Sequence, residues 1–115
     1  MTDPALGNYL RMHRIKAGLS QREVANLLGY ARPWQVSRHE LSKTAPPLLT
    51  ALAYQHIFQM PVSALFTGMH MTVADVIEQK LSAFERDLQD RSGKGHMAKA
   101  TAHKLQWLTQ RKSLA

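Results

Sequence analysis

The stretch from Gly18 to Gly29 constrains the fold of this chain more than any other. Ser20 is followed three residues later by Glu23, which is the spacing of a capping box at the start of a helix. Glycine is common just past the end of a helix, so Gly29 marks a stop. We predict a short helix that starts at Gln21 and stops at Gly29, with an inner face of Val24, Ala25 and Leu28.

Glycines and prolines divide the remaining sequence in the same way. The alternation of β-branched residues that is typical of strands is missing throughout, so we predict an all-α fold. Five short helices should precede two longer ones. The expected boundaries are Gly18, Gly29, residues 42–47, Pro61, Gly68 and the Gly93/Gly95 pair.

Proline suits the first turn of a helix, so the third helix should run from about Pro33 to Leu41. Its spacing turns Val36 inward and Trp34, Ser37 and Arg38 outward. A fourth helix from about 47 to 58 and a fifth from about 61 to 66 should complete the core, through Leu48, Leu52, Ile57, Phe58, Val62, Leu65 and Phe66.

Composition and charge limit what the chain can bind. With 115 residues and 44% hydrophobic composition, we expect one modest domain and an appendage. A net charge of +7 and a pI near 10.2 are typical of proteins that bind polyanions, with nucleic acid favoured over an anionic membrane. No apolar run approaches the ~18 residues of a membrane span. The N-terminus lacks the order of a signal peptide, so we expect a cytoplasmic, nucleoid-associated protein.

A set of spaced residues over roughly 6–67 resembles the Cro/repressor-type helix-turn-helix family, also called the XRE family. The matching positions are Leu10-Arg11, Arg14, Gly18-Leu19-Ser20-Gln21, Glu23-Val24-Ala25, Leu28-Gly29, Val36-Ser37-Arg38, Glu40, Pro46 and Val62…Leu65-Phe66. The resemblance implies a five-helix, lambda-repressor-like DNA-binding domain over residues 1–68. It also implies that the third helix enters the DNA major groove.

The resemblance assigns roles to residues around that helix. Trp34, Gln35, Ser37 and Arg38 are expected to read bases, and Arg38 is the best candidate for a bidentate contact to guanine. Gln21, Arg32 and Lys43 are expected to contact the DNA backbone. Arg14 and Glu40 match family positions that form a structural ion pair between the first and third helices.

The sequence departs from the family pattern at three points. Val36 lies seven residues after Gly29, where the family usually has six, so the turn is one residue longer. We expect Pro33 to set the helix start after this turn and Arg32 to be the N-cap. His39 occupies a position that is usually apolar, and Ser42 one that is often glycine.

No pattern of catalytic or metal-binding residues emerges. None of the six histidines forms an i, i+4 pair, and the chain has no cysteine. No paired carboxylates or glycine-rich phosphate loop are present, so we expect no enzyme, no cofactor and no metal site.

Residues 69–115 are expected to form a helical extension that serves in dimerisation or assembly. Thr72 and Asp75 have capping spacing and precede an apolar seam, and a second helix follows the glycine pair. The seam residues are Ile77, Leu81, Phe84 and Leu88, then Met97, Thr101, Leu105 and Leu108 with Trp107 alongside. Such narrow seams require another helix, from the same chain or from a second subunit.

Two functions therefore compete. The first is a sequence-specific transcriptional regulator that acts as a homodimer on an inverted-repeat operator in double-stranded DNA. The second is an antitoxin-like protein that binds a partner toxin through its C-terminal helices and autoregulates its operon.

Overall fold

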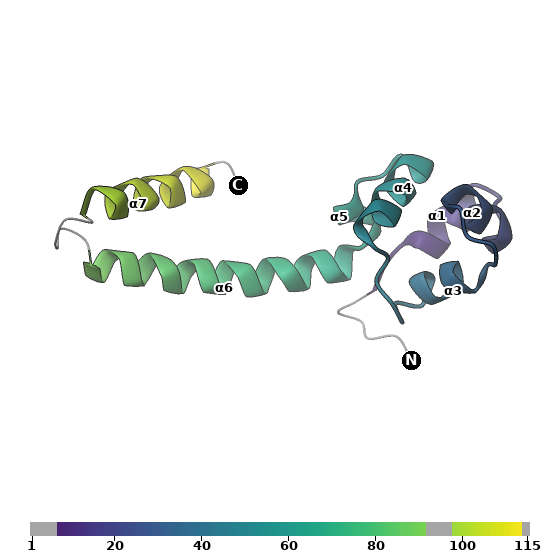
Figure 1. The fold of residues 1–115 in the computed structure, drawn as a ribbon, viewed down its shortest axis with the longest axis horizontal. Helices are drawn as coiled ribbons and strands as arrows, with labels where there is room; N and C mark the ends of the chain where they lie inside the picture. Colours follow the sequence, from purple (N-terminus) through teal and green to yellow (C-terminus); the bar gives the residue numbers. More distant parts are fainter. Residues whose placement is uncertain (1–6, 92–97, 114–115) are drawn as a thin grey trace. The chain divides into compact units, whose positions relative to one another are not determined.

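The computed structural model describes residues 7–91 and 98–113, and these ranges contain helices and no strand, which confirms the all-α prediction (Figure 1). Five short helices precede two longer ones, as expected. They are α1 (Leu10–Lys16), α2 (Gln21–Leu28), α3 (Trp34–Glu40), α4 (Leu48–Phe58), α5 (Val62–Leu65), α6 (Thr67–Arg91) and α7 (Ala98–Ser113). The expected seam residue Met97 and the expected break at Gly93/Gly95 lie outside the described residues.

The chain forms two compact units that divide between Val73 and Ala74. The first unit contains α1 to α5 and the start of α6. Its core comprises Leu10, Val24, Ala25, Val36, Ala51, Tyr54, Leu65 and Phe66. Val24 and Ala25 of the predicted inner face of α2 and the inward Val36 belong to this core, and Leu28, the third residue predicted for that face, is partly buried against it.

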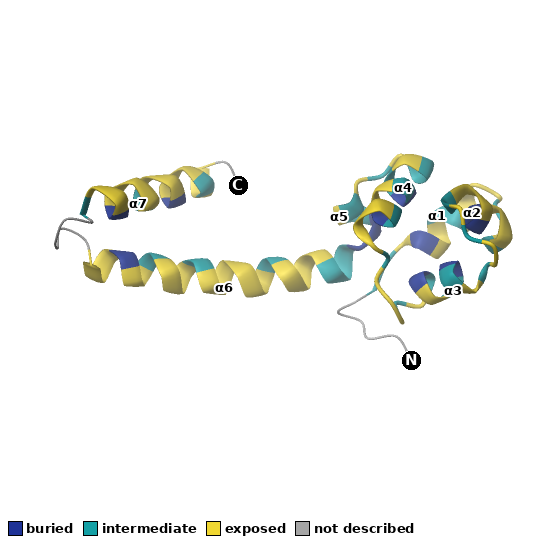
Figure 2. Ribbon diagram, in the orientation of Figure 1, coloured by how far each residue is buried: buried dark blue, intermediate teal, exposed yellow. Residues whose placement is uncertain are grey.

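The expected core residues of α4 are only partly correct, because Phe58 packs against the core but Leu48 and Leu52 do not. Leu48 and Leu52 are 72% and 44% exposed, whereas Ala51 and Tyr54 are buried (Figure 2). The helix has apolar residues on every side, so helical spacing alone does not select the buried face. Packing against α2 and α5 selects it instead.

The start of α6 also differs from the prediction. The helix begins at Thr67, so Gly68 lies inside it. Thr72 is therefore not a cap, and its hydroxyl donates to the carbonyl oxygen of Gly68 at 2.9 Å. This bond to the preceding turn is the usual alternative for a threonine within a helix.

The second unit contains the rest of α6 and α7, which pair within one chain. Leu88 and Leu108 are buried apolar side chains, and Thr101 is buried with them. Two ion pairs link the helices, Arg111 with Glu78 at 2.9 Å and Lys112 with Glu85 at 2.8 Å. Partly exposed ion pairs of this kind contribute little stability.

Within residues 7–91 and 98–113, two non-glycine residues have positive φ, and Gln59 at the end of α4 is one of them, with a φ of 52°. Its side-chain amide donates to the carbonyl oxygen of His56 at an exposed position. A residue with a Cβ is strained in this left-handed conformation, which glycine adopts freely.

Gln59→Gly should therefore stabilise the first unit by up to about 1 kcal/mol, because it relieves the left-handed strain. Urea unfolding followed by circular dichroism would measure the change. His56→Gly, three residues earlier and within the helix, is the matched control and should destabilise the protein by roughly 0.5–1 kcal/mol. A loss of stability in Gln59→Gly would contradict the strain assigned to this position.

Candidate nucleic-acid interface

The capping box of Ser20 and Glu23 sets the start of α2, and the left-handed conformation of Gly29 sets the turn from α2 toward α3. The Ser20 hydroxyl accepts a bond from the backbone N–H of Glu23 at 3.0 Å, and the Glu23 carboxylate accepts from the backbone N–H of Ser20 at 2.9 Å. These bonds lower the pKa of Glu23. Gly29 has a φ of 87°, and the N–H of Tyr30 then bonds to the carbonyl oxygen of Ala25 at 2.8 Å. The chain turns sharply out of α2 as a result.

The start of α3 differs in one detail from the prediction. Pro33, and not Arg32, is the residue that precedes the helix, and no side chain caps it. Pro33 has helical backbone angles, and its carbonyl oxygen accepts a bond from the N–H of Ser37 at 3.1 Å. The locked φ of proline thus sets the first turn, as expected for the longer connection.

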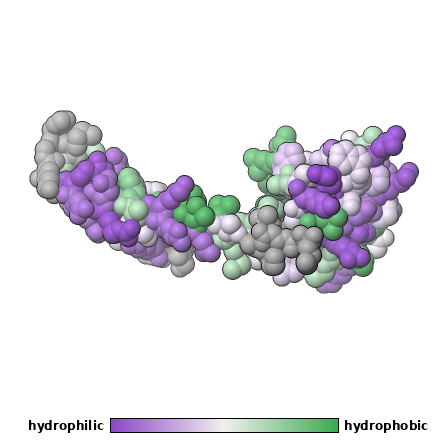
Figure 3. Space-filling view, turned by 90° about the horizontal axis from the view of Figure 1, so that it is seen from below, coloured by the Kyte–Doolittle hydropathy of each residue, from purple (hydrophilic) through white to green (hydrophobic). Residues whose placement is uncertain are grey.

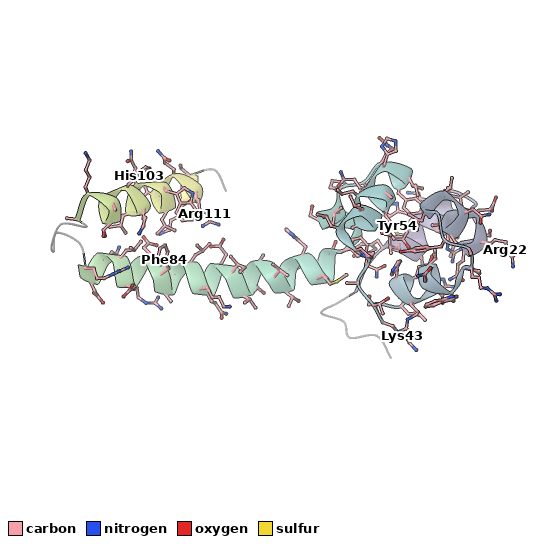
Figure 4. The ribbon with its side chains drawn as sticks, viewed as in Figure 1. Arg22, Lys43, Tyr54, Phe84, His103 and Arg111 are labelled. Carbon is pink, nitrogen blue, oxygen red and sulfur yellow. The ribbon has the colours of Figure 1, made fainter. Side chains whose placement is uncertain are left out.

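Two side chains of α3 point into the core. Val36 is fully buried, and His39 is 5% exposed. The Nδ1 atom of His39 bonds to the hydroxyl of Tyr54 on α4 at 2.8 Å, and the two rings meet edge to face. Figure 4 shows Tyr54 inside the first unit. Burial lowers the pKa of His39 and raises that of Tyr54, so both groups are neutral near pH 7.

An ion pair joins α1 to the end of α3. Arg14 donates from Nε to Oε2 of Glu40 at 2.5 Å and from Nη2 to Oε1 at 3.1 Å. The Arg14 Nη1 also donates to the carbonyl oxygen of Leu19 at 3.0 Å. The two side chains are only 13% and 4% exposed, and the bond to Glu40 raises the pKa of Arg14. The carboxylate is thus buried with its charge compensated.

Gln21 takes part in the same network. Its side-chain Nε2 donates to Oε1 of Glu40 at 3.1 Å, so one of its two amide hydrogens is used inside the protein. The family resemblance predicts a contact to the DNA backbone for this residue. Its second amide hydrogen is the part of the side chain left for such a contact.

The outer side of α3 borders an open depression of about 550 Å³ in the first unit. Six of the seven residues expected to contact DNA line it, and Gln35 does not. The lining residues are Gln21, Arg32, Pro33, Trp34, Ser37, Arg38, Leu41 and Lys43. Trp34 is 56% exposed here, as its spacing from Val36 predicts.

The loop after α3 positions Lys43 at one edge of this depression. Ser42 has a φ of 58°, and the N–H of Lys43 bonds to the carbonyl oxygen of Arg38 at 2.9 Å. Figure 4 shows the Lys43 side chain extending away from the protein. Asn8 fixes the position of this loop, because its amide Nδ2 donates to the carbonyl oxygen of His39 and to the hydroxyl of Ser42, both at 2.9 Å.

Sequence reasoning missed Asn8 and Tyr54. Asn8 also accepts a bond from the N–H of Leu10 at 3.0 Å, which is typical of a residue near a helix start. That local signal was available in the sequence. Its bonds to a loop more than thirty residues away were not.

The lining of the depression carries three cationic side chains, an exposed indole and no carboxylate. Guanidinium and ammonium groups bind phosphate oxygens, and arginine can also bond to the edge of guanine. Among residues 7–91 and 98–113, no three histidine, cysteine or acidic side chains cluster as a metal site would require. No helix in these ranges has the length and apolar character of a membrane span.

A short helix that is anchored by buried side chains and follows a capped helix after a tight turn is the arrangement of a helix-turn-helix motif. Residues 5–53 match the family model described as a helix-turn-helix domain. The chain thus contains a helix-turn-helix domain, consistent with the Cro/repressor type, and such domains indicate a DNA-binding regulator and are typically not enzymes. A search of curated proteins found no match to this chain.

Removing either partner of the buried ion pair should destabilise the first unit. Arg14→Ala or Glu40→Ala should each cost about 1–3 kcal/mol, because the remaining partner keeps a single hydrogen bond, from Gln21 or to Leu19, and its charge is left uncompensated in a mostly buried place. The double variant should lose less than the sum. Urea unfolding of the four proteins would measure this coupling, and strictly additive losses would show that the two groups do not interact.

The buried His39 should make stability depend on pH. Because burial lowers its pKa below the ordinary value, the unfolded chain binds a proton at higher pH than the folded chain. Stability is full above about pH 6.5 and falls as the pH drops toward the folded pKa, by at most about 1.4 kcal/mol per pH unit. Urea midpoints between pH 8 and 5 would show this fall.

His39→Leu should flatten that dependence, since leucine does not titrate. His56→Ala, which removes an exposed histidine, is the control and should keep the slope of the native protein. An unchanged slope in His39→Leu would assign the pH dependence to another group.

Proposed function

We propose that this protein is a transcriptional regulator that binds a specific DNA sequence as a homodimer. The observation that carries the proposal is the shared surface of Arg32, Trp34, Arg38 and Lys43, which joins cations and an aromatic ring around the outer side of α3. The surface contains no acidic side chain that would repel phosphate. The helix-turn-helix match supports DNA as the partner.

In this proposal α3 lies in the major groove and its outer side chains read base edges. Arg38 is exposed and two residues from the buried Val36, so its guanidinium can reach the O6 and N7 atoms of a guanine. Trp34, Gln35 and Ser37 complete the reading set. Trp34 offers an apolar ring for a thymine methyl group or a sugar.

Three residues would hold the DNA backbone on either side of that helix. Arg32 and Lys43 lie at the two ends of α3 and supply positive charge. Gln21 begins α2, where backbone N–H groups and the free amide hydrogen of its side chain are available. Phosphate contacts at these points would set the register of α3 in the groove.

One such module is small, so two copies on an inverted repeat would supply the affinity. The half-sites should lie about one helical turn, roughly 10 bp, or a multiple of it apart. In this proposal residues 69–115 assemble the two copies. A cytoplasmic, nucleoid-associated location follows from the DNA partner.

Arg38→Ala and Lys43→Ala should affect DNA binding in different ways. Arg38→Ala should relax the preference at one position of each half-site and cost about 1–3 kcal/mol on the preferred sequence. Lys43→Ala should weaken binding to all sequences alike and reduce the dependence of log K on log salt by about one unit. Both quantities come from binding measured across an operator library at several salt concentrations.

Arg32→Ala is the comparison variant for this experiment. If Arg32→Ala changes the base preferences and Arg38→Ala does not, α3 is rotated relative to the proposed orientation. The base-reading role would then pass from Arg38 to residues nearer the start of the helix.

A further inference from the structure

The loop after α3 holds a serine in a backbone conformation that usually selects glycine. Ser42 has a φ of 58°, and the bonds around it are those of a Schellman motif. The N–H of Ser42 donates to the carbonyl oxygen of His39 at 3.1 Å, and the N–H of Lys43 donates to that of Arg38 at 2.9 Å. Glycine is the usual residue at the left-handed position of this motif, because a Cβ is strained there. A compensating interaction is therefore expected at Ser42.

Asn8 supplies this interaction. Its amide Nδ2 donates to the carbonyl oxygen of His39 and to the hydroxyl of Ser42, both at 2.9 Å, and its Oδ1 accepts from the N–H of Leu10 at 3.0 Å. A carbonyl oxygen can only accept and a backbone N–H can only donate, so these partners fix which end of the amide faces the loop. Both amide hydrogens are used, and they bond to the backbone and to a side chain of the same loop.

The segment that carries Asn8 is itself anchored. The N–H of Tyr9 donates to the carbonyl oxygen of Leu65, the last residue of α5, at 2.8 Å. The carbonyl oxygen of Gly7 accepts from the N–H of Gly68 in α6 at 3.0 Å. Asn8 lies between these two bonds, and its side chain is partly buried. Its amide therefore has a fixed position from which it can hold the loop after α3.

Lys43 is the next residue of this loop, and its direction depends on the turn at Ser42. Lys43 is exposed, and Figure 4 shows its side chain extending away from the protein. Figure 3, which views the molecule from below, shows a mostly hydrophilic surface on this side of the first unit. Packing against other side chains therefore does not direct the Lys43 ammonium. The hydrogen-bonded turn sets the direction in which this side chain leaves the backbone.

We propose that Asn8 is a positioning residue for DNA binding, because its two hydrogen bonds hold Ser42 in the left-handed conformation and so direct Lys43 toward a DNA phosphate. Asn8 itself does not touch DNA in this proposal, since both of its amide hydrogens are used within the protein. The backbone contact of Lys43 belongs to the function proposed above, and the role of Asn8 rests on it. Asn8 and Ser42 together take the place of the glycine that the family often has here.

Asn8→Ser removes the bonds to the loop and keeps the local one. A serine hydroxyl can still accept from the N–H of Leu10, but the side chain is too short to bridge the two acceptors in the loop. On a single selected half-site, Asn8→Ser should bind about ten-fold more weakly, and the slope of log K against log salt should fall by about one unit, as in Lys43→Ala. Base preferences across an operator library should not change.

A cycle of double variants tests whether Asn8 acts through Lys43. Asn8→Ser combined with Lys43→Ala should bind no more weakly than Lys43→Ala alone, because the contact that Asn8 positions is then already absent. If Asn8 only stabilised the fold, its loss would multiply that of Lys43→Ala. Losses that multiply would overturn the proposal.

Ser42→Gly supplies a rescue in the Asn8→Ser background. Glycine adopts the left-handed conformation without strain, so the loop no longer depends on the amide of Asn8. Asn8→Ser with Ser42→Gly should recover most of the affinity and the native dependence on salt. A loss that persists in this double variant would show that Asn8 does not act by holding Ser42, and the proposal would fail.

Asn26→Ser is the matched control, because it makes the same substitution at an exposed position of α2. It should bind DNA like the native protein. Urea unfolding of each variant, followed by circular dichroism, gives the folded fraction by which its affinity is corrected. A loss of affinity in Asn8→Ser that this correction removes would assign Asn8 to folding alone and overturn its role in binding.

Lys43→Ala separates failure of this role from failure of the proposed function. A weakened Lys43→Ala beside a native-like Asn8→Ser would overturn the role of Asn8 alone. Unchanged affinity and salt dependence in Lys43→Ala would overturn the backbone contact of Lys43, and the role of Asn8 with it. A native protein without any sequence preference would contradict the regulator, but the same cycle could be measured on that DNA, because phosphate contacts do not depend on sequence.

Discussion

The buried ion pair between Arg14 and Glu40 determines how the DNA-binding unit is arranged. It joins α1 to the end of α3, and through Gln21 and the carbonyl oxygen of Leu19 it also reaches the start of α2. A carboxylate as buried as that of Glu40 requires a compensating charge and full hydrogen bonding. The three helices therefore hold one mutual position, and the outer side of α3 is presented in a defined orientation.

The helix boundaries could be predicted from the sequence because local chemistry determines them. Ser20 with Glu23 starts α2, Gly29 ends it, and Pro33 sets the start of α3. The buried face of α4 could not be predicted, since Leu48, Leu52 and Tyr54 are all apolar or aromatic and lie around the helix. Only contacts with other helices decide which of them is buried.

The candidate site also has features that could be predicted from the sequence and features that could not. Trp34, Val36 and Arg38 lie in the same helix, so the outward positions of Trp34 and Arg38 follow from their spacing to the buried Val36. The bond from His39 to Tyr54 and the bonds from Asn8 to the loop after α3 link residues far apart in the chain. The pairing of Arg14 with Glu40 came from family resemblance, because a separation of 26 residues leaves no local pattern.

The inner side of α3 holds this helix in the protein without the side chains of its outer side. Val36, His39 and Glu40 connect the helix to the core, to α4 and to α1, while the side chains on the opposite side make no contribution to these connections. The two sides of this seven-residue segment therefore differ in what a substitution would disturb. If α3 reads bases as proposed, substitutions of Trp34, Gln35 and Arg38 would alter the preferred DNA sequence and leave the connections of α3 to the core, α4 and α1 intact.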